Sequence, residues 1–241
     1  MTRVPTTSSI PRILHQTYRD DKIPAKLATL QSSWLKHNPH WQYRFWSDND
    51  IREFIAEHYA DFLEVFDAYP HNIMRVDAFR YLLLHHHGGI YADLDFECLL
   101  PMDELLADQD ILLIPEPEEH INKHKPRVRN LDYVVSNALM ASVPGHPFWR
   151  EVVELLKKSA NNPDVLDATG PFILTYAHKD FTPTIPLANP RNFDGLLSDD
   201  HGKVGGRTEG VAQDVATDTP ANIPMYARHH WAGTWWKRPL I

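Results

Sequence analysis

The sequence is poor in three features, and each shortage excludes a class of protein. The 241-residue chain has a single cysteine, Cys98, so no internal disulfide bond can form. Its longest apolar stretches, such as residues 111–114, are far shorter than the roughly 20 residues of a membrane-spanning helix. Acidic residues outnumber basic ones by 32 to 24, and the basic face of a nucleic-acid-binding protein is missing. The polar amino terminus lacks the apolar run of a signal peptide, so we expect a cytoplasmic protein without a transmembrane segment.

The composition is that of a folded protein with a substantial core. Hydrophobic residues make up 43% of the chain, which is enough for one α/β domain. Helical and strand-like patterns alternate, which predicts a mostly parallel central sheet with flanking helices. The expected strands are 12–17, 41–46, 89–93, 111–114 and 133–140, and the expected helices begin near residues 24, 47, 72, 147 and 171.

No linker divides the chain, so we expect residues 1–241 to form a single domain. Residues 1–9 are expected to be flexible. Residues 198–219 are polar and rich in Gly, Asp and Thr, which favours a mobile loop.

The predicted helix over residues 72–87 carries two charged residues on an otherwise apolar face. Asp77 and Arg80 share this face with Ile73 and Leu84, and Gly88 is well placed to end the helix in a left-handed cap. One interpretation is a salt bridge on a half-buried helix. The other is a binding site in which Asp77 accepts sugar or ribose hydroxyls and Arg80 supports a sugar or diphosphate.

The motif Asp-x-Asp occurs three times, at residues 48–50, 93–95 and 108–110, so the pattern by itself is uninformative. The first pair reads as a helix start and the third as a turn. Asp93 and Asp95 differ because they follow Gly-Gly and an apolar strand. In extended chain, residues i and i+2 project to the same side, so their carboxylates would repel each other. A divalent cation shared with substrate phosphates would remove this conflict.

The residues around this pair form one extended pattern: Arg75-x-Asp77-x-x-Arg80-Tyr81-x-x-Leu84-x-x-x-Gly88-Gly89-Ile90-Tyr91-x-Asp93-x-Asp95. The pattern resembles the sugar-binding region with a DXD motif in glycosyltransferase family thirty-two. That family includes fungal α-mannosyltransferases and bacterial polysaccharide enzymes, and the large glucosylating toxins are more distantly similar. Further similar segments lie at residues 10–17, 34–46 and 169–171, at Asn137, and in the late His-Trp-x-Gly-Thr-Trp sequence.

The resemblance implies a GT-A fold, a nucleotide-sugar donor, a Mn²⁺ or Mg²⁺ ion and transfer with retention at the anomeric carbon. Carried over residue by residue, it implies these roles: catalytic Asp77, Arg80, Asp93 and Asp95; metal-binding Asp93, Asp95 and His229; donor-binding Gln16, Thr17, Asp77, Arg80, Tyr91, Asp93, Asn137, Thr234 and Trp235. The doubled His229-His230 and Trp235-Trp236 leave the register open by one residue.

The expected partners are a UDP- or GDP-hexose donor and an acceptor that is a carbohydrate, a glycolipid or a protein. The absence of a preceding anchor favours a bacterial-type cytoplasmic enzyme, with peripheral membrane contact as an option. Two alternatives stay open. A nucleotidyltransferase also uses paired aspartates, although residues 12–21 lack its Gly-rich loop or lysine cluster. A carbohydrate-binding protein without catalysis would use the tryptophans alone.

Two further segments carry expectations. Consecutive residues on a helix point in different directions, so the run at residues 85–87 is expected to be structural rather than a metal site. Residues 229–236 contain two histidines and three tryptophans, and we expect them to close over the donor as a lid without being needed for folding of the core.

Overall fold

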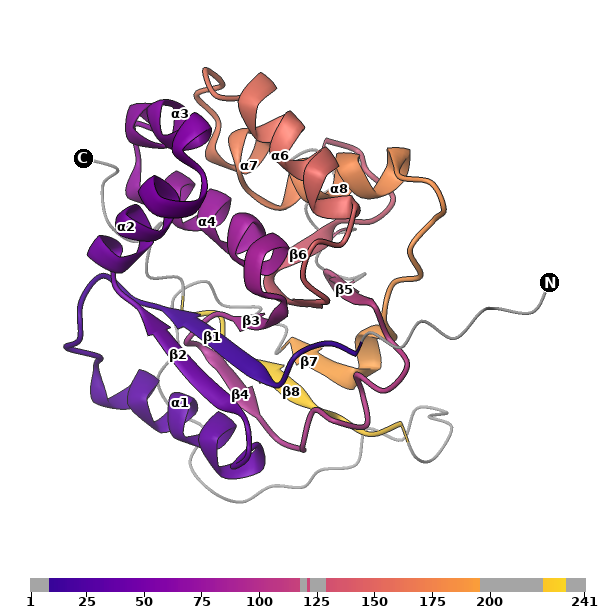
Figure 1. Ribbon diagram of the computed structural model, residues 1–241. Coiled ribbons are helices and arrows are strands. Elements are labelled where there is room, and N and C mark those ends of the chain that lie inside the picture. The colour runs from indigo at the N-terminus through magenta and orange to yellow at the C-terminus, as the bar shows by residue number, and fades with distance from the viewer. Residues whose placement is uncertain (1–8, 118–120, 122–128, 196–222, 233–241) are drawn as a thin grey trace.

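A five-stranded sheet forms the centre of the molecule (Figure 1). The computed structural model describes residues 9–117, 121, 129–195 and 223–232. The sheet order is β2-β1-β3-β6-β5. Its strands are β1 (Ile13–Thr17), β2 (Gln42–Trp46), β3 (Gly89–Ala92), β5 (Ile111–Pro115) and β6 (Val135–Ser142).

The central sheet is mostly parallel, as predicted, with one antiparallel strand. Strand β1 runs parallel to β2 and β3, but β6 is antiparallel to both β3 and β5. Four of the five strands thus share one direction, and β6 runs against them because it follows β5 directly and the chain returns alongside it. Strand β6 also lies two residues later than the predicted 133–140.

A second, three-stranded sheet has the order β4-β8-β7. It consists of β4 (Phe96–Cys98), β7 (Phe193–Gly195) and β8 (Ala227–His229). Strand β4 follows β3 after three residues, so residues 93–95 connect the two sheets. The last described strand, β8, is the middle strand of this sheet and pairs Phe96 with His229.

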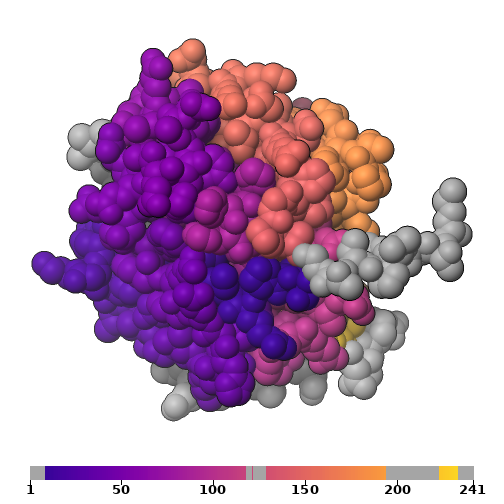
Figure 2. All heavy atoms as spheres, in the orientation of Figure 1, coloured from indigo at the N-terminus to yellow at the C-terminus, as the bar shows by residue number. Residues whose placement is uncertain are grey.

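Helices pack on one face of the central sheet, and α1 (Ala25–His37) lies with the small sheet on the other face (Figure 1). The helices of the first face are α2 (Asp48–His58), α3 (Leu63–Ala68), α4 (Asn72–His87), α6 (Phe148–Lys158), α7 (Val165–Ala168) and α8 (Pro171–Asp180). Short 3-10 helices span Ala60–Phe62 and Pro190–Asn192. In the same orientation, Figure 2 shows the purple helices α2 and α3 on the left and α6 to α8 on the upper right.

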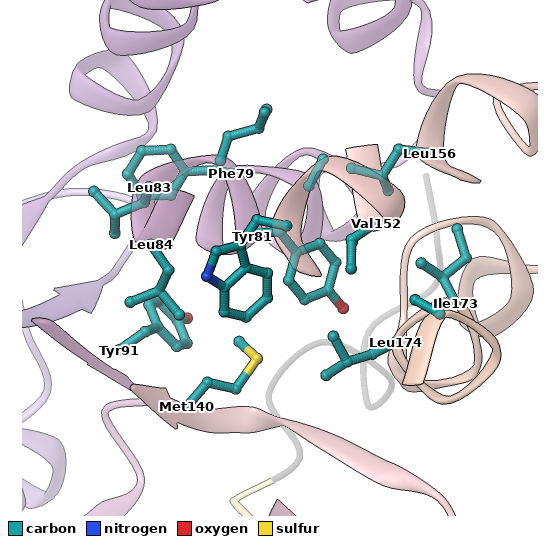
Figure 3. Close-up of a cluster of buried hydrophobic side chains, with 14 of the residues drawn as sticks. Phe79, Tyr81, Leu83, Leu84, Tyr91, Met140, Val152, Leu156, Ile173 and Leu174 are labelled. Carbon is teal, nitrogen blue, oxygen red and sulfur yellow. The ribbon is translucent and has the colours of Figure 1, made fainter. Parts of the chain in front are cut away.

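Helix α4 is the central helix of the larger core (Figure 3). Residues 77–84 are all buried, because the helix is enclosed by the sheet below it and by neighbouring helices beside it. Tyr81, Val152 and Leu174 meet in this core from α4, α6 and α8. The tight enclosure holds the charged residues of α4 in fixed positions, which matters for the site at the end of β3.

The turn from α4 into β3 depends on two glycines with positive φ, and Gly88 ends the helix as predicted. At Gly89, with φ of 89°, an added Cβ would lie 2.5 Å from the carbonyl oxygen of Ile13. We expect Gly89→Ala to lower the free energy of unfolding by about 3 kcal/mol or more, since strain and a backbone clash add. Gly145 is a matched control because its φ is 72° but nothing lies within 4 Å of an added Cβ.

Gly145→Ala should cost only about 1 kcal/mol in urea unfolding. Equal losses in the two variants would show that the crowding at Gly89 is unimportant.

Candidate active site

Asp93 and Asp95 lie where the central sheet passes into the small sheet. The backbone N–H of Asp93 donates to the carbonyl of Ala138 on β6, and the N–H of Phe96 donates back to the carbonyl of Asp93. Residues 93–96 therefore form a turn, which corrects the premise that the pair stands on extended chain. The intervening Leu94 is buried in a cluster with α1 residues. The turn, together with this anchor, fixes the backbone from which both carboxylates extend.

Arg80 is the central cation of the site. Its guanidinium lies 3.1 Å from the carboxylate of Asp77 and 3.6 Å from that of Asp93. It also donates to the carbonyl oxygen of Asn137 at 2.7 Å and lies over the ring of Tyr91, 4.7 Å from its centroid. The side chains of Arg80 and Asp77 are only 4% and 7% exposed, whereas that of Asp93 is 30% exposed. The Asp77–Arg80 pair is thus fully buried, not half-buried as the sequence indicated.

The charges of this cluster do not balance. Burial raises the pKa of Asp77 to about 7, although Arg80 opposes the shift. Burial also raises the pKa of Asp93, again against the effect of Arg80. One guanidinium is shared by two carboxylates in a poorly solvated place, so an additional positive charge nearby would be stabilising.

Asp95 has a partner from the far end of the described chain. Nε2 of His229 lies 3.3 Å from Oδ1 of Asp95, and the N–H of Ala232 donates to Oδ2 at 2.9 Å. Burial acts against ionisation of both groups, but their contact lowers the pKa of Asp95 and raises that of His229. His230 instead contacts Glu97 at 2.9 Å. The doubled histidine is therefore divided between two carboxylates, and His229 is the one that faces Asp95.

The predicted donor-binding residues of β1 and β3 converge on Asp93. Tyr91 donates from its hydroxyl to Oδ1 of Asp93 at 2.6 Å, and the Thr17 hydroxyl lies 3.0 Å from the same tyrosine oxygen. Nε2 of Gln16 lies 3.5 Å from the carbonyl oxygen of Asp93. Asn137 donates to Asp77 at 3.1 Å. Thr234, Trp235 and Trp236, and the loop at 198–219, lie outside the described residues.

Several residues of the site had no assigned role in the sequence. Thr169, just before α8, donates to Asp77 at 3.3 Å, and the Tyr81 hydroxyl accepts from Asn137 at 3.1 Å. Their membership of the family-like segments was the available signal. Phe96 and Trp231 contact the ring of His229, and nothing in the local sequence indicated these contacts.

The histidine run at the end of α4 has structural contacts, as predicted. The ring of His85 contacts the Tyr59 hydroxyl at 2.9 Å, while the ring of His86 packs against that of His58 at 4.1 Å. Within the described parts of the chain, no group of three His, Cys, Asp or Glu residues could hold a metal ion by itself.

A metal ion shared with a ligand is nevertheless compatible with the site. Neighbouring ligands of an octahedral ion with bonds of about 2.1 Å lie about 3 Å apart, close to the 3.3 Å between Asp95 and His229. Magnesium and similar ions at nucleotide sites use one or two carboxylates and complete their coordination with phosphates and water. The carboxylates of Asp93 and Asp95 fit that type of donor set, to which the His229 imidazole would add one nitrogen.

Comparison with known sequences agrees with this geometry. Residues 24–112 match the sequence profile of the glycosyltransferase sugar-binding region containing a DXD motif, and this segment includes Asp77, Arg80, Asp93 and Asp95. The chain belongs to the DXD-motif glycosyltransferases. The resemblance inferred from the sequence pattern is thereby confirmed.

Two fungal relatives are mannosyl-transferring proteins by name. Inositol phosphoceramide mannosyltransferase 1 of Schizosaccharomyces pombe is 35% identical over 69% of this chain and 50% of its own length. Mannosyl phosphorylinositol ceramide synthase SUR1 of Saccharomyces cerevisiae is 34% identical over 73% of this chain and 44% of its own. The chain thus spans about half the length of these curated relatives.

A solved glycosyltransferase structure has the same overall fold as this chain. A galactosyltransferase, LgtC, in complex with donor and acceptor sugar analogues superposes with a TM-score of 0.51, covering 95% of this chain and 90% of LgtC at 14% identity. The mixed α/β architecture is that of the GT-A glycosyltransferases. Across the residues that the structure describes, no helix has both the length and the apolar character needed to cross a membrane.

Proposed function

We propose that the chain is a metal-dependent glycosyltransferase that moves a hexose from a nucleotide diphosphate sugar to an acceptor, with retention at the anomeric carbon. The observation that carries this proposal is the arrangement around Asp93, where a buried guanidinium lies on one side and Asp95, in the same turn, pairs with His229 of β8. A diphosphate requires positive charge, and a sugar requires fixed hydrogen-bonding groups. Both kinds of group occur in this one cluster.

Asp77 and Arg80 would hold the sugar end of the donor. Their positions are fixed by burial and by Asn137, so little side-chain entropy is lost when a ligand binds. Two buried polar atoms, Nε of Arg80 and Oε1 of Gln16, have no hydrogen-bond partner among the described residues. Buried polar groups are normally satisfied, so these atoms support a polar occupant of the site.

Asp93, Asp95 and His229 would hold Mn²⁺ or Mg²⁺ together with the diphosphate. When bound, such an ion neutralises the charge that develops on the leaving diphosphate. Tyr91 and Thr17 would orient Asp93, because the tyrosine hydroxyl donates to its carboxylate. Thr234 and Trp235 are proposed as donor contacts from the sequence resemblance alone.

The relatives support a particular donor and acceptor class. Since inositol phosphoceramide mannosyltransferase 1 and SUR1 carry mannosyl transfer and a sphingolipid in their names, we propose mannose as the hexose and a glycolipid as the acceptor. A lipid acceptor would require peripheral contact of a cytoplasmic-type enzyme with a membrane surface. The nucleotide, GDP or UDP, is left to the assay.

The test is to incubate the protein with a panel of UDP- and GDP-hexoses and Mn²⁺, and to measure released nucleotide diphosphate. We expect release with one donor, faster in the presence of a glycolipid acceptor and abolished by EDTA. Formation of a nucleoside triphosphate and a sugar 1-phosphate from the donor, seen only when pyrophosphate is added, would instead indicate a nucleotidyltransferase. If the protein binds sugar but releases nucleotide diphosphate from none of the donors, the proposal is contradicted and a carbohydrate-binding protein is favoured.

A further inference from the structure

Residues 229–232 lie around Asp95 and contact it through backbone and side-chain groups. His229 lies 3.3 Å from Oδ1, and the N–H of Ala232 donates to Oδ2 at 2.9 Å. The N–H of His230 donates to the backbone carbonyl of Asp95, also at 2.9 Å. Both carboxylate oxygens and the carbonyl oxygen of one aspartate are therefore contacted by three residues within a run of four.

The chain must turn back sharply to make these contacts, and Trp231 is the residue at which it turns. Its φ is 46°, in the left-handed region that bulky side chains rarely adopt. This conformation lets the N–H of Ala232 donate to the same Asp95 carboxylate that His229 contacts. A glycine would satisfy the backbone at this position without strain, so the tryptophan side chain calls for a separate explanation.

The ring of Trp231 provides that explanation. It packs against the ring of His229, with ring centroids 4.1 Å apart. The ring of Phe96 also stacks on the imidazole of His229, with centroids 4.3 Å apart and an angle of 9° between the ring planes. Phe96 is the register partner of His229 across β4 and β8. Two aromatic contacts restrict rotation of the imidazole. The edge nitrogen Nε2 is thereby kept toward Asp95.

We propose that Trp231 is a positioning residue of the metal site. This inference rests on the proposed function: the Trp231 ring and its left-handed backbone hold His229 and Asp95 as a ready pair of metal ligands before any donor binds. Partners that orient metal ligands typically change metal affinity by 10- to 100-fold when they are removed. Trp231 itself contacts neither the sugar nor the ion in this scheme.

The experiment measures Mn²⁺ affinity of the full chain by calorimetry in the absence of donor, with melting temperature recorded on the same samples. Trp231→Ala should weaken Mn²⁺ binding about 10- to 100-fold, and Trp231→Phe, which keeps a ring, should stay within about threefold of wild type. Trp231→Gly removes the ring and the strain together, so it should weaken binding as alanine does while melting no lower than alanine. Trp41→Ala is the matched control, because this partly buried tryptophan donates to Asp103 in another part of the molecule.

Asp95→Ala separates the two levels of the proposal. If Asp95→Ala loses Mn²⁺ binding while Trp231→Ala and Trp231→Gly bind within threefold of wild type, the metal site stands and the positioning role of Trp231 is refuted. If Asp95→Ala binds Mn²⁺ as well as wild type does, the metal is held elsewhere and the proposed function loses its site. A glycine variant with full affinity would also refute the role of the ring.

Discussion

Asp95→Asn should lower kcat/KM by at least ~100-fold while the protein stays folded. The substitution keeps the shape of the side chain, and the amide oxygen can still accept from the N–H of Ala232. It removes the negative charge that would bind the metal and pair with His229. Metal ions contribute several kcal/mol of transition-state stabilisation, so the loss should fall on turnover. Steady-state kinetics with saturating Mn²⁺ and a melting curve measure both sides of the claim.

The matched control is Asp108→Asn, in another Asp-x-Asp pair of this chain. Asp108 is exposed and has φ of 58°, which asparagine adopts readily, so this variant should behave as wild type. Normal turnover of Asp95→Asn in the presence of EDTA would remove the central claim. A collapse in melting temperature would instead show that the Asp95–His229 contact is needed mainly for folding.

Arg80→Ala should both destabilise the protein and abolish its activity. The sequence suggested a partly exposed i, i+3 pair, whose loss would hardly change the melting temperature. In the structure, Arg80 is the shared counter-charge of buried Asp77 and of Asp93, so its removal leaves two carboxylates uncompensated. Breaking a buried ion pair costs about 3–5 kcal/mol. We therefore expect a large drop in the urea midpoint, and stability alone no longer separates a structural role from a catalytic one.

Two measurements restore that distinction. Burial already raises the pKa of Asp77 to about 7, so the carboxyl is protonated at low pH and the deficit of Arg80→Ala should be larger at pH 8 than at pH 5. Adding Asp77→Asn removes one unpaired charge and should recover part of the stability. If the double variant regains stability and is as active as Asp77→Asn alone, Arg80 serves only the fold. If stability returns while activity stays far below that of Asp77→Asn alone, Arg80 acts on the donor.

The sequence was sufficient to predict the elements that carry a strong local signal. Helix α4 begins at Asn72 and ends at His87 as predicted, because apolar spacing and Gly88 specify it locally. The antiparallel direction of β6 could not be predicted, since the side-chain pattern of a strand is the same in either direction. Strands of three residues, such as β4 and β8, contain too few positions to show an alternating pattern.

The site divides in the same way. Asp77, Arg80 and Asp93 lie within one continuous motif, so their proximity could be expected from the helix–turn–strand that joins them. The contact of His229 with Asp95 depended on family resemblance, and the roles of Phe96 and Trp231 had no sequence signal. Nor could periodicity predict that Asp77 and Arg80 are fully buried, because enclosure of α4 depends on where α6 and α8 pack.

The position of β8 determines the order in which the two halves of the site can be assembled. Asp77, Arg80 and Asp93 come from adjacent elements and can meet through short loop closures early in folding. The other half must wait for a segment 137 residues further along the chain, since Ala232 reaches back to Asp95 across that separation. Long-range closures of this kind are slow, and during synthesis they come after amino-terminal contacts have formed. A nascent chain could pair Arg80 with Asp77 and Asp93 before it contains His229. The proposed ability to bind a metal ion would therefore be acquired last.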